Sequence, residues 1–158
     1  MIYSLETDQT LSRPLDDVFP FFADAGNLEA ITPPELRFSI ETPRPIEMHP
    51  GALIEYRLTL YGVRFRWLTE ISVWEPGRRF VDRQLLGPFA LWHHEHRFSS
   101  EGPESTRIQD TVHYALPLDP LGRFAHPLVR RQLDRIFDYR TAQVEALLGR
   151  PATESAQA

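Results

Sequence analysis

The stretch LGRFAHPLVRRQLDRIFDYRTAQVEALL, residues 121–148, decides the fold. Its apolar residues recur every three or four positions with charged residues between them, which predicts one long amphipathic helix. Gly149 and Pro151 mark the end of this helix. A helix of this length with one wide apolar face needs a large apolar partner. The residues of that face are Leu121, Phe124, Leu128, Leu133, Ile136, Phe137, Val144, Leu147 and Leu148.

The chain before this helix contains a series of strand-like runs. Apolar and polar residues alternate with period two at 2–11, 53–60, 63–73, 80–86, 90–98 and 106–116, and a shorter run spans 36–41. Short turns containing Gly or Pro separate the later runs, as in an antiparallel meander with one solvent-exposed face. Two short helices are expected after the first strand, before Pro33-Pro34. We therefore predict an α+β fold in which a curved, seven-stranded antiparallel sheet wraps around the C-terminal helix.

Length and composition indicate one soluble domain. The chain has 158 residues, and we expect a single domain over 1–149 followed by a disordered tail over 150–158. A net charge of −5 argues against a nucleic-acid partner. No run approaches the roughly 18 apolar residues of a membrane span, and the first residues lack the form of a signal peptide. These patterns predict a cytoplasmic protein.

Two residue types are absent from the sequence. There is no Cys, so disulfides, thiol nucleophiles and thiolate metal sites are excluded. All 17 basic residues are Arg, and without Lys no Schiff base can form.

The face of the sheet that the helix covers is unusually polar. Burying so many polar groups in a dry core is unfavourable unless each has a partner, which favours a partly solvated cavity. The side chains on that face are Tyr56, Trp67, Thr69, Asp82, Gln84, Trp92, His94, His96, Asp110 and Tyr114.

Strand order predicts where the charged members of this set meet. The turns at Gly87-Pro88 and near Gly102 place the His94 strand between the strands of Asp82 and Asp110. His94 is then one cross-strand neighbour from both carboxylates. A carboxylate beside an imidazole is expected to fix its tautomer and to raise its pKa.

Three interpretations of this polar set remain open. It forms a satisfied buried network that shapes the core, it orients the polar end of a ligand in a pocket lined by aromatic side chains, or a His–Asp pair performs general acid–base catalysis. His94-x-His96 with Asp110 also suggests a metal, but no third unambiguous ligand is apparent, and we predict none.

The opposite, solvent-exposed face of the sheet carries many charges. Arginines among acidic residues predict cross-strand ion pairs on a solvated surface, although a basic docking surface for a protein partner is an alternative. These residues are Arg57, Arg64, Arg66, Arg83, Arg97 and Arg107 among Glu55, Glu70 and Glu95.

Several motifs resemble the START-like helix-grip superfamily (SRPBCC), which includes plant pathogenesis-related allergens, polyketide aromatase/cyclases and lipid-transfer domains. The likeness is greatest to its uncharacterised bacterial ligand-binding proteins. It covers about residues 1–148 and implies two small helices, a seven-stranded sheet, a gripping C-terminal helix and a pocket for a hydrophobic ligand. The motifs are FADAGNL (22–28), ITPP (31–34), Trp67-x-Thr69-x-Ile71, Phe80-Val81-Asp82, Gly87-Pro88-Phe89, Trp92-x-His94-x-His96-x-Phe98, Thr106 with Asp110 and Tyr114, and IFDYR (136–140).

We therefore predict binding of an apolar or aromatic small molecule, lipid- or polyketide-like, between sheet and helix, with no cofactor. The alternative is a cyclase- or hydratase-like enzyme, for which His94, His96 and Asp110 are candidate catalytic residues, although none is assigned. The predicted ligand-binding residues are Tyr56, Phe65, Trp67, Thr69, Asp82, Gln84, Trp92, His94, His96, Phe98, Asp110, Tyr114 and Phe137.

Overall fold

A seven-stranded antiparallel sheet with the order β1-β7-β6-β5-β4-β3-β2 forms the frame of the molecule. The computed structural model describes residues 1–149, and the predicted tail, 150–158, lies outside the described residues. The strands are β1 (Tyr3–Leu11), β2 (Ser39–Ile40), β3 (Ala52–Leu60), β4 (Val63–Glu75), β5 (Arg79–Leu86), β6 (Leu91–Gly102) and β7 (Ser105–Ala115). All neighbouring strands pair in antiparallel register.

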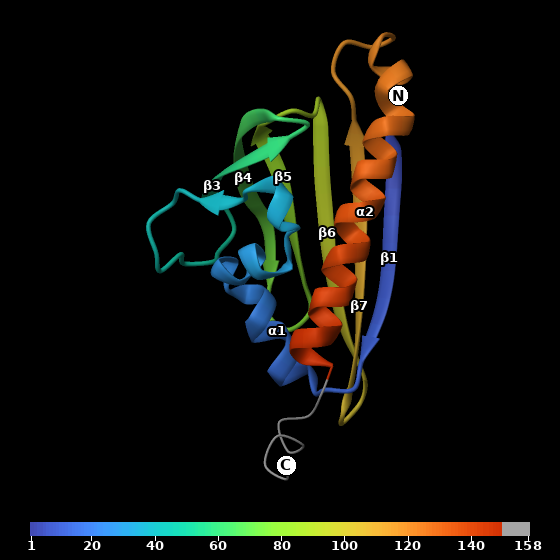
Figure 1. Ribbon diagram of the computed structural model, residues 1–158. Coiled ribbons are helices and arrows are strands. Elements are labelled where there is room, and N and C mark those ends of the chain that lie inside the picture. The colour runs from blue at the N-terminus through green and yellow to red at the C-terminus, as the bar shows by residue number, and fades with distance from the viewer. Residues whose placement is uncertain (150–158) are drawn as a thin grey trace.

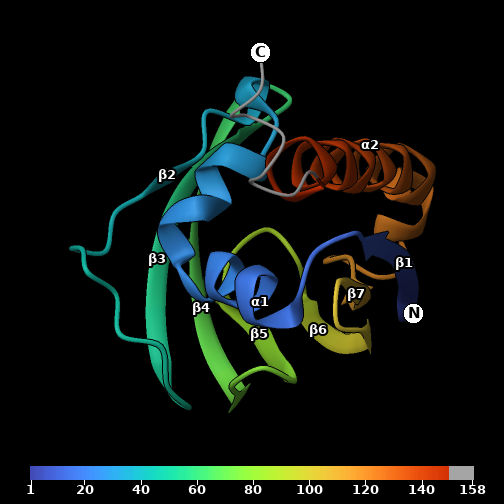
Figure 2. The ribbon, with the colours of Figure 1, turned by 90° about the horizontal axis from the view of Figure 1, so that it is seen from below.

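The long helix α2 (Gly122–Leu148) lies across the concave side of this sheet (Figure 1). Seen from below, the sheet curves from β3 round to β1, with α2 along its open side (Figure 2). Helix α1 (Leu15–Ala23) and the 3-10 turns η1 (Ala25–Ile31) and η2 (Pro34–Leu36) follow β1 and close one end. The predicted seven-stranded helix-grip architecture is confirmed.

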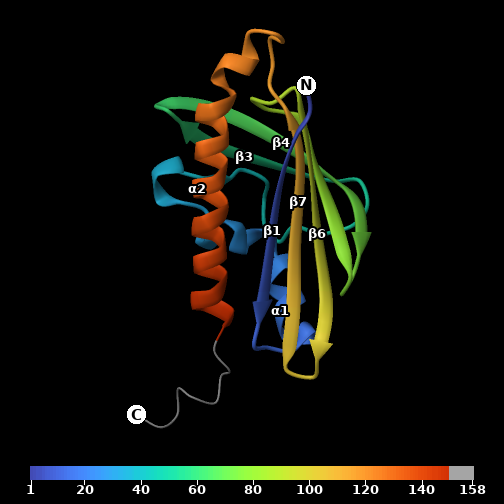
Figure 3. The same ribbon diagram turned by 90° about the vertical axis from the view of Figure 1, so that its right-hand side faces the viewer.

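Two apolar clusters hold the layers together. The smaller one joins α1, the ends of β1, β6 and β7, and the last turns of α2 through buried residues such as Val18, Phe98 and Val144. The larger one lies under the middle of α2 and along β3, β4, β6 and β7, and includes Trp67, Trp92 and Phe137. Figure 3 shows α2 running lengthwise beside β1 and β7, with α1 at the lower end.

The first turns of α2 depart from the predicted packing. The sequence pattern places Leu121, Phe124 and Leu128 on the buried face, but their side chains are 68%, 85% and 54% exposed. The reason is that this part of the helix lies beyond the well-packed core, beside the β3–β4 turn. Tyr61 in that turn donates a hydrogen bond to the carbonyl of Leu128, at 3.2 Å.

The outer face of the sheet carries cross-strand ion pairs, as the charge pattern predicts. Arginines on the strands contact carboxylates on neighbouring strands or loops. Except in the Arg79–Glu95 pair, the arginine is largely exposed, so each of these pairs contributes little stability. They are Arg57–Glu41, Arg66–Glu55, Arg83–Glu70, Arg79–Glu95 and Arg107–Asp8. Within residues 1–149, no helix is both long and apolar enough to cross a membrane.

Adjacent leucines at the end of α2 test how the helix is anchored. The sequence pattern places both on the apolar face of the helix. Leu148 is 7% exposed within the smaller apolar cluster, but Leu147 is 48% exposed and does not belong to the buried face. We expect Leu148→Ala to lower the free energy of unfolding by about 2–3 kcal/mol, because it removes buried methyl groups and leaves a cavity. Leu147→Ala, with the same change in helix propensity, should stay within about 0.5 kcal/mol of wild type. Urea unfolding followed by circular dichroism measures both, and equal losses would contradict this packing.

Candidate functional site

A cavity of about 630 Å³ lies between α2, the concave face of the sheet and the 3-10 turns. Its walls are largely apolar. β3 contributes Ile54, Tyr56 and Leu58, and α2 contributes residues including Val129 and Phe137. The volume is typical of a site for a small organic molecule.

Aromatic rings form one side of the cavity. The indole rings of Trp67 and Trp92 meet edge to face with centroids 5.2 Å apart, and Phe89 packs 4.9 Å from Trp92. The Trp67 Nε1–H donates to the hydroxyl of Thr69, at 3.1 Å, which leaves the indole face toward the cavity apolar. Edge-to-face pairs of this kind fix ring orientation and contribute beyond their buried area.

The cavity opens at the end where α2 begins. Its lining there includes Tyr61 and Val63 of the β3–β4 turn and Leu118 and Leu121 before and at the start of α2. These side chains are more than half exposed, so the entrance is ringed by apolar groups in contact with solvent. The exposed apolar side chains of Leu118 and Leu121 thus border the cavity, whereas those of Phe124 and Leu128 do not line it.

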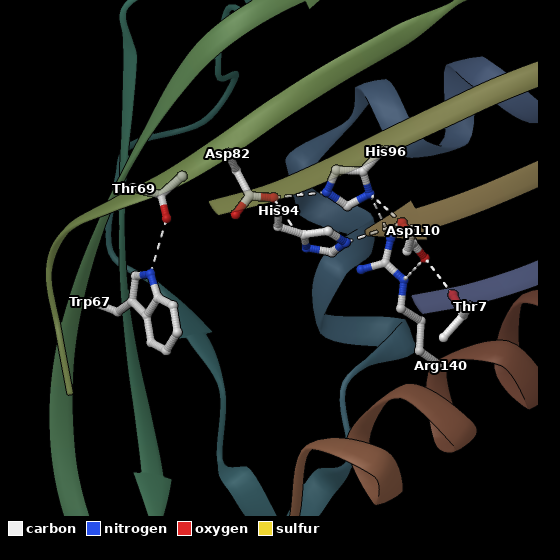
Figure 4. A network of polar contacts seen from close by, with 8 residues as sticks. All are labelled: Thr7, Trp67, Thr69, Asp82, His94, His96, Asp110 and Arg140. Carbon is white, nitrogen blue, oxygen red and sulfur yellow. Dashed lines mark hydrogen bonds and ion pairs between the residues drawn. The ribbon is translucent and has the colours of Figure 1, made fainter. Parts of the chain in front are cut away.

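The inner end of the cavity is charged. Asp82, His94 and His96 line it from β5 and β6, and Arg140 reaches it from α2 (Figure 4). Asp110 of β7 lies directly behind the two imidazoles. All five side chains are less than a fifth exposed.

Sheet register brings these groups together. Asp82 is opposite His94, and His96 is opposite Asp110, so the predicted placement of the histidine strand between the two carboxylates is confirmed. His94 Nε2–H donates to Asp110 Oδ1 at 3.1 Å, and His96 Nε2–H donates to Asp82 Oδ2 at 2.8 Å. The two rings lie with centroids 3.7 Å apart.

Two further residues complete the network. The guanidinium of Arg140 lies 3.7 Å from Asp110 Oδ2, and its Nη2 lies 3.2 Å from His96 Nδ1. Thr7 of β1 donates to Asp110 Oδ2 at 3.3 Å. The network therefore connects β1, β5, β6, β7 and α2.

The carboxylates of this cluster are held in the ionised form. Burial alone would raise the pKa of Asp110, but Arg140 and the two histidines outweigh it and hold that pKa well below its usual range. Burial also opposes ionisation of Asp82, yet His94 and His96 lower its pKa. Both acids therefore carry charge despite their burial.

The two histidines are shifted in opposite directions. Burial and the proximity of His96 lower the pKa of His94, so the predicted increase is wrong for this residue, because desolvation outweighs the carboxylates. Burial also opposes protonation of His96, but Asp110 and Asp82 outweigh it and raise that pKa. Of the two imidazoles, His94 is therefore the one more readily kept neutral.

Nine of the thirteen predicted ligand-binding residues line the cavity. They are Tyr56, Phe65, Trp67, Thr69, Asp82, Trp92, His94, His96 and Phe137.

The other four predicted residues lie elsewhere, for identifiable reasons. Asp110 is screened from the cavity by the histidines. Gln84 turns its amide to the backbone of Phe89, donating to its carbonyl at 2.7 Å. Phe98 packs on the rings of α1, and Tyr114 bonds through its hydroxyl to His126 Nε2 at 3.1 Å.

Sequence reasoning missed Arg140, which lines the cavity and contacts both His96 and Asp110. A signal was present, because Arg140 occupies the turn between Phe137 and Val144. The buried positions of α2 are Leu133, Phe137, Val144 and Leu148. A charged residue at an expected apolar position of a helix indicates a buried partner.

Removing Arg140 tests the charge balance of the cluster. Arg140→Met should lower the free energy of unfolding by about 3 kcal/mol, because it leaves a buried carboxylate without its cation. Arg135→Met is the matched control, since Arg135 is on the same helix and pairs with Glu35 at the surface. That control should lose less than about 1 kcal/mol. Urea unfolding measures the free energy of unfolding of both variants. Equal losses in the two variants would show that the buried charge of Asp110 does not depend on Arg140.

The sequence matches no protein-family model and no curated protein. Solved structures do match. The Zhui aromatase/cyclase from Streptomyces sp. R1128 superposes with a TM-score of 0.74 at 18% identity, over 91% of this chain and 92% of that one. A START superfamily protein from Mycobacterium smegmatis gives 0.65 at 15% identity, over 91% and 98%.

Ara h 8.0201 also matches, with a TM-score of 0.63 at 15% identity, over 92% of this chain and 99% of that one. Identities this low show the fold and nothing finer. Coverage is nearly complete in each comparison, so the likeness extends over the sheet, the small helices and α2 together. The chain therefore has the same helix-grip fold as these solved structures.

Proposed function

We propose that this protein binds an apolar or aromatic small molecule, lipid- or polyketide-like, whose polar end is held by Asp82, His94, His96 and Arg140. The observation that carries the proposal is a cavity with apolar walls and one charged cluster at its closed end. Burial of an apolar ligand there contributes about 25 cal/mol of favourable free energy per Å² of apolar surface. The entropic cost of ordering the ligand and the protein reduces this gain.

The polar end of the ligand is defined by the groups that face it. Arg140 offers N–H donors, and Asp82 offers an acceptor. An oxygen-bearing end, such as a carboxylate, enolate or phenol, satisfies these groups better than a cation, which Arg140 would repel. Trp67 and Trp92 favour an aromatic or unsaturated body beside this end.

A probe with the same chemistry tests binding. The fluorescent dye 8-anilinonaphthalene-1-sulfonate combines fused aromatic rings with an anionic group, and its emission should rise on binding to the full chain. Val129→Trp places an indole in the cavity and should weaken dye binding by roughly tenfold or more, because the added volume overpacks the site. The measurement is a fluorescence titration at constant ionic strength.

The control for that titration is Ala142→Trp. Ala142 is exposed on α2 and does not line the cavity, so an indole there should leave the dye affinity unchanged. Equal affinity in both variants and wild type would place the dye outside the cavity and contradict the proposal.

A second candidate function is cyclase- or hydratase-like catalysis. It is favoured by the two imidazoles in the cavity wall, each held by a carboxylate, in a fold shared with an aromatase/cyclase. In such a reaction one imidazole removes a proton from a carbon next to a carbonyl while a protonated group donates to the carbonyl oxygen.

Separating the two candidates requires binding and turnover on the same variants. With a linear triketone as substrate, loss of water and ring closure produce a new aromatic absorbance. If the protein is an enzyme, His94→Gln and His96→Gln should still bind the dye, because Arg140 and the apolar walls remain, and should lose about 10²–10⁴-fold in turnover. No wild-type turnover above the buffer rate would leave binding as the function.

A further inference from the structure

Three metal-ligating atoms converge at the inner end of the cavity. His94 Nδ1 lies 3.4 Å from Asp82 Oδ2, and His96 Nε2 lies 2.8 Å from the same oxygen. One ligand atom from each residue falls within 4.8 Å of the other two. A first-row metal ion with bonds of roughly 2.0–2.2 Å holds its ligand atoms about 3 Å apart, so the two distances to Asp82 are close to those of a coordination sphere.

The hydrogen bond of His94 leaves one ligand atom without a proton. Its Nε2–H donates to Asp110 Oδ1, so in the neutral imidazole Nδ1 is an acceptor. This lone pair faces Asp82 Oδ2, which is also an acceptor, at 3.4 Å. Two acceptors facing each other repel, and a cation between them converts that repulsion into attraction.

The second histidine can be oriented in the same way. His96 Nδ1 lies 2.9 Å from Asp110 Oδ1, so a proton on Nδ1 directed at Asp110 leaves Nε2 free toward Asp82. Asp110 would then stand behind both rings. A carboxylate in this position fixes the tautomer of a metal-binding imidazole and increases its basicity.

The sequence alone did not predict a metal, because His94-x-His96 lacked a third ligand. The β5–β6 register supplies it by setting Asp82 opposite His94. Two imidazoles and one carboxylate form a donor set that binds Zn²⁺ or Fe²⁺ and leaves coordination positions open.

We propose that Asp82, His94 and His96 bind a divalent first-row transition-metal ion at the closed end of the cavity. The three residues line the cavity, so the open positions face a bound molecule. Together with Arg140, Asp82 and Asp110, the ion gives the cluster one net positive charge. This charge selects an anionic oxygen, such as a carboxylate or enolate, as the additional ligand.

Metal binding is tested on the full chain after treatment with a chelator. Isothermal titration with Zn²⁺ should give one ion per chain, and Co²⁺ should produce visible absorption bands typical of nitrogen and oxygen ligands. Asp82→Asn and His96→Gln should abolish both signals. Asp110→Asn keeps all three ligands but loses the group behind the rings, so it should weaken Zn²⁺ binding about 10–100-fold.

The matched control is the double variant His93→Gln/His113→Gln. These histidines face each other on neighbouring strands β6 and β7, with ring centroids 6.3 Å apart, and do not line the cavity. Zn²⁺ affinity should be unchanged in this variant. Binding that survives Asp82→Asn and His96→Gln, or that disappears with the control pair, overturns the proposal.

Two further measurements keep the test decisive. Circular dichroism shows whether Asp82→Asn folds. If it does not, the Co²⁺ complex of the wild-type protein is studied by NMR, and the paramagnetic ion should shift the imidazole N–H signals of two histidines. Failure to see them overturns the assignment. Dye titration of the metal-free chain reports the proposed binding function separately, so either proposal can fail without the other.

Discussion

Two buried carboxylates set the main physical constraint on this molecule. Asp82 and Asp110 remain ionised inside the protein, and they do so only because Arg140 and two imidazoles surround them. Removal of two charges from water is strongly unfavourable unless each charge is paired and hydrogen bonded. The pairing requires β5, β6, β7 and α2 at fixed positions, so the charged cluster determines where the helix crosses the sheet.

This position of α2 has a consequence for the rest of the helix. Its last turns pack in the apolar cluster with α1, and Arg140 fixes the next turn inward. The first turns contact β1 and β7 through His126, which stacks on Tyr3 and bonds to Tyr114, and Val129 on the next turn lines the cavity. A helix that is held against the sheet near both ends can cover a cavity without filling it. The polar cluster and the hollow interior are therefore parts of one arrangement.

Much of this could be predicted from the sequence, because period-two alternation states which side chains share a face and turn positions state which strands are neighbours. That was sufficient to place Asp82, His94, His96 and Asp110 together. The alternation does not show which residues of that face reach the cavity. Phe98 and Tyr114 share the face but lie under α1 and the start of α2, away from the cavity. The sequence also did not show that Arg140 reaches the cavity, since the rotation of a helix about its axis depends on packing. The direction of the shift in the pKa of His94 was missed because desolvation exceeds the effect of the carboxylates.

Stability alone does not account for such a cluster. Buried ion pairs are often no more stable than well-packed apolar side chains of the same volume, so a core could be built more simply without them. A cluster that only shaped the core would have no need to border a cavity. Here Asp82, His94, His96 and Arg140 all reach the cavity wall, while Asp110 and Thr7 support them from behind. A binding site for a polar atom has this arrangement, in which residues behind the cavity wall hold the cavity-lining residues in position. The apolar walls then determine what kind of molecule carries that polar atom.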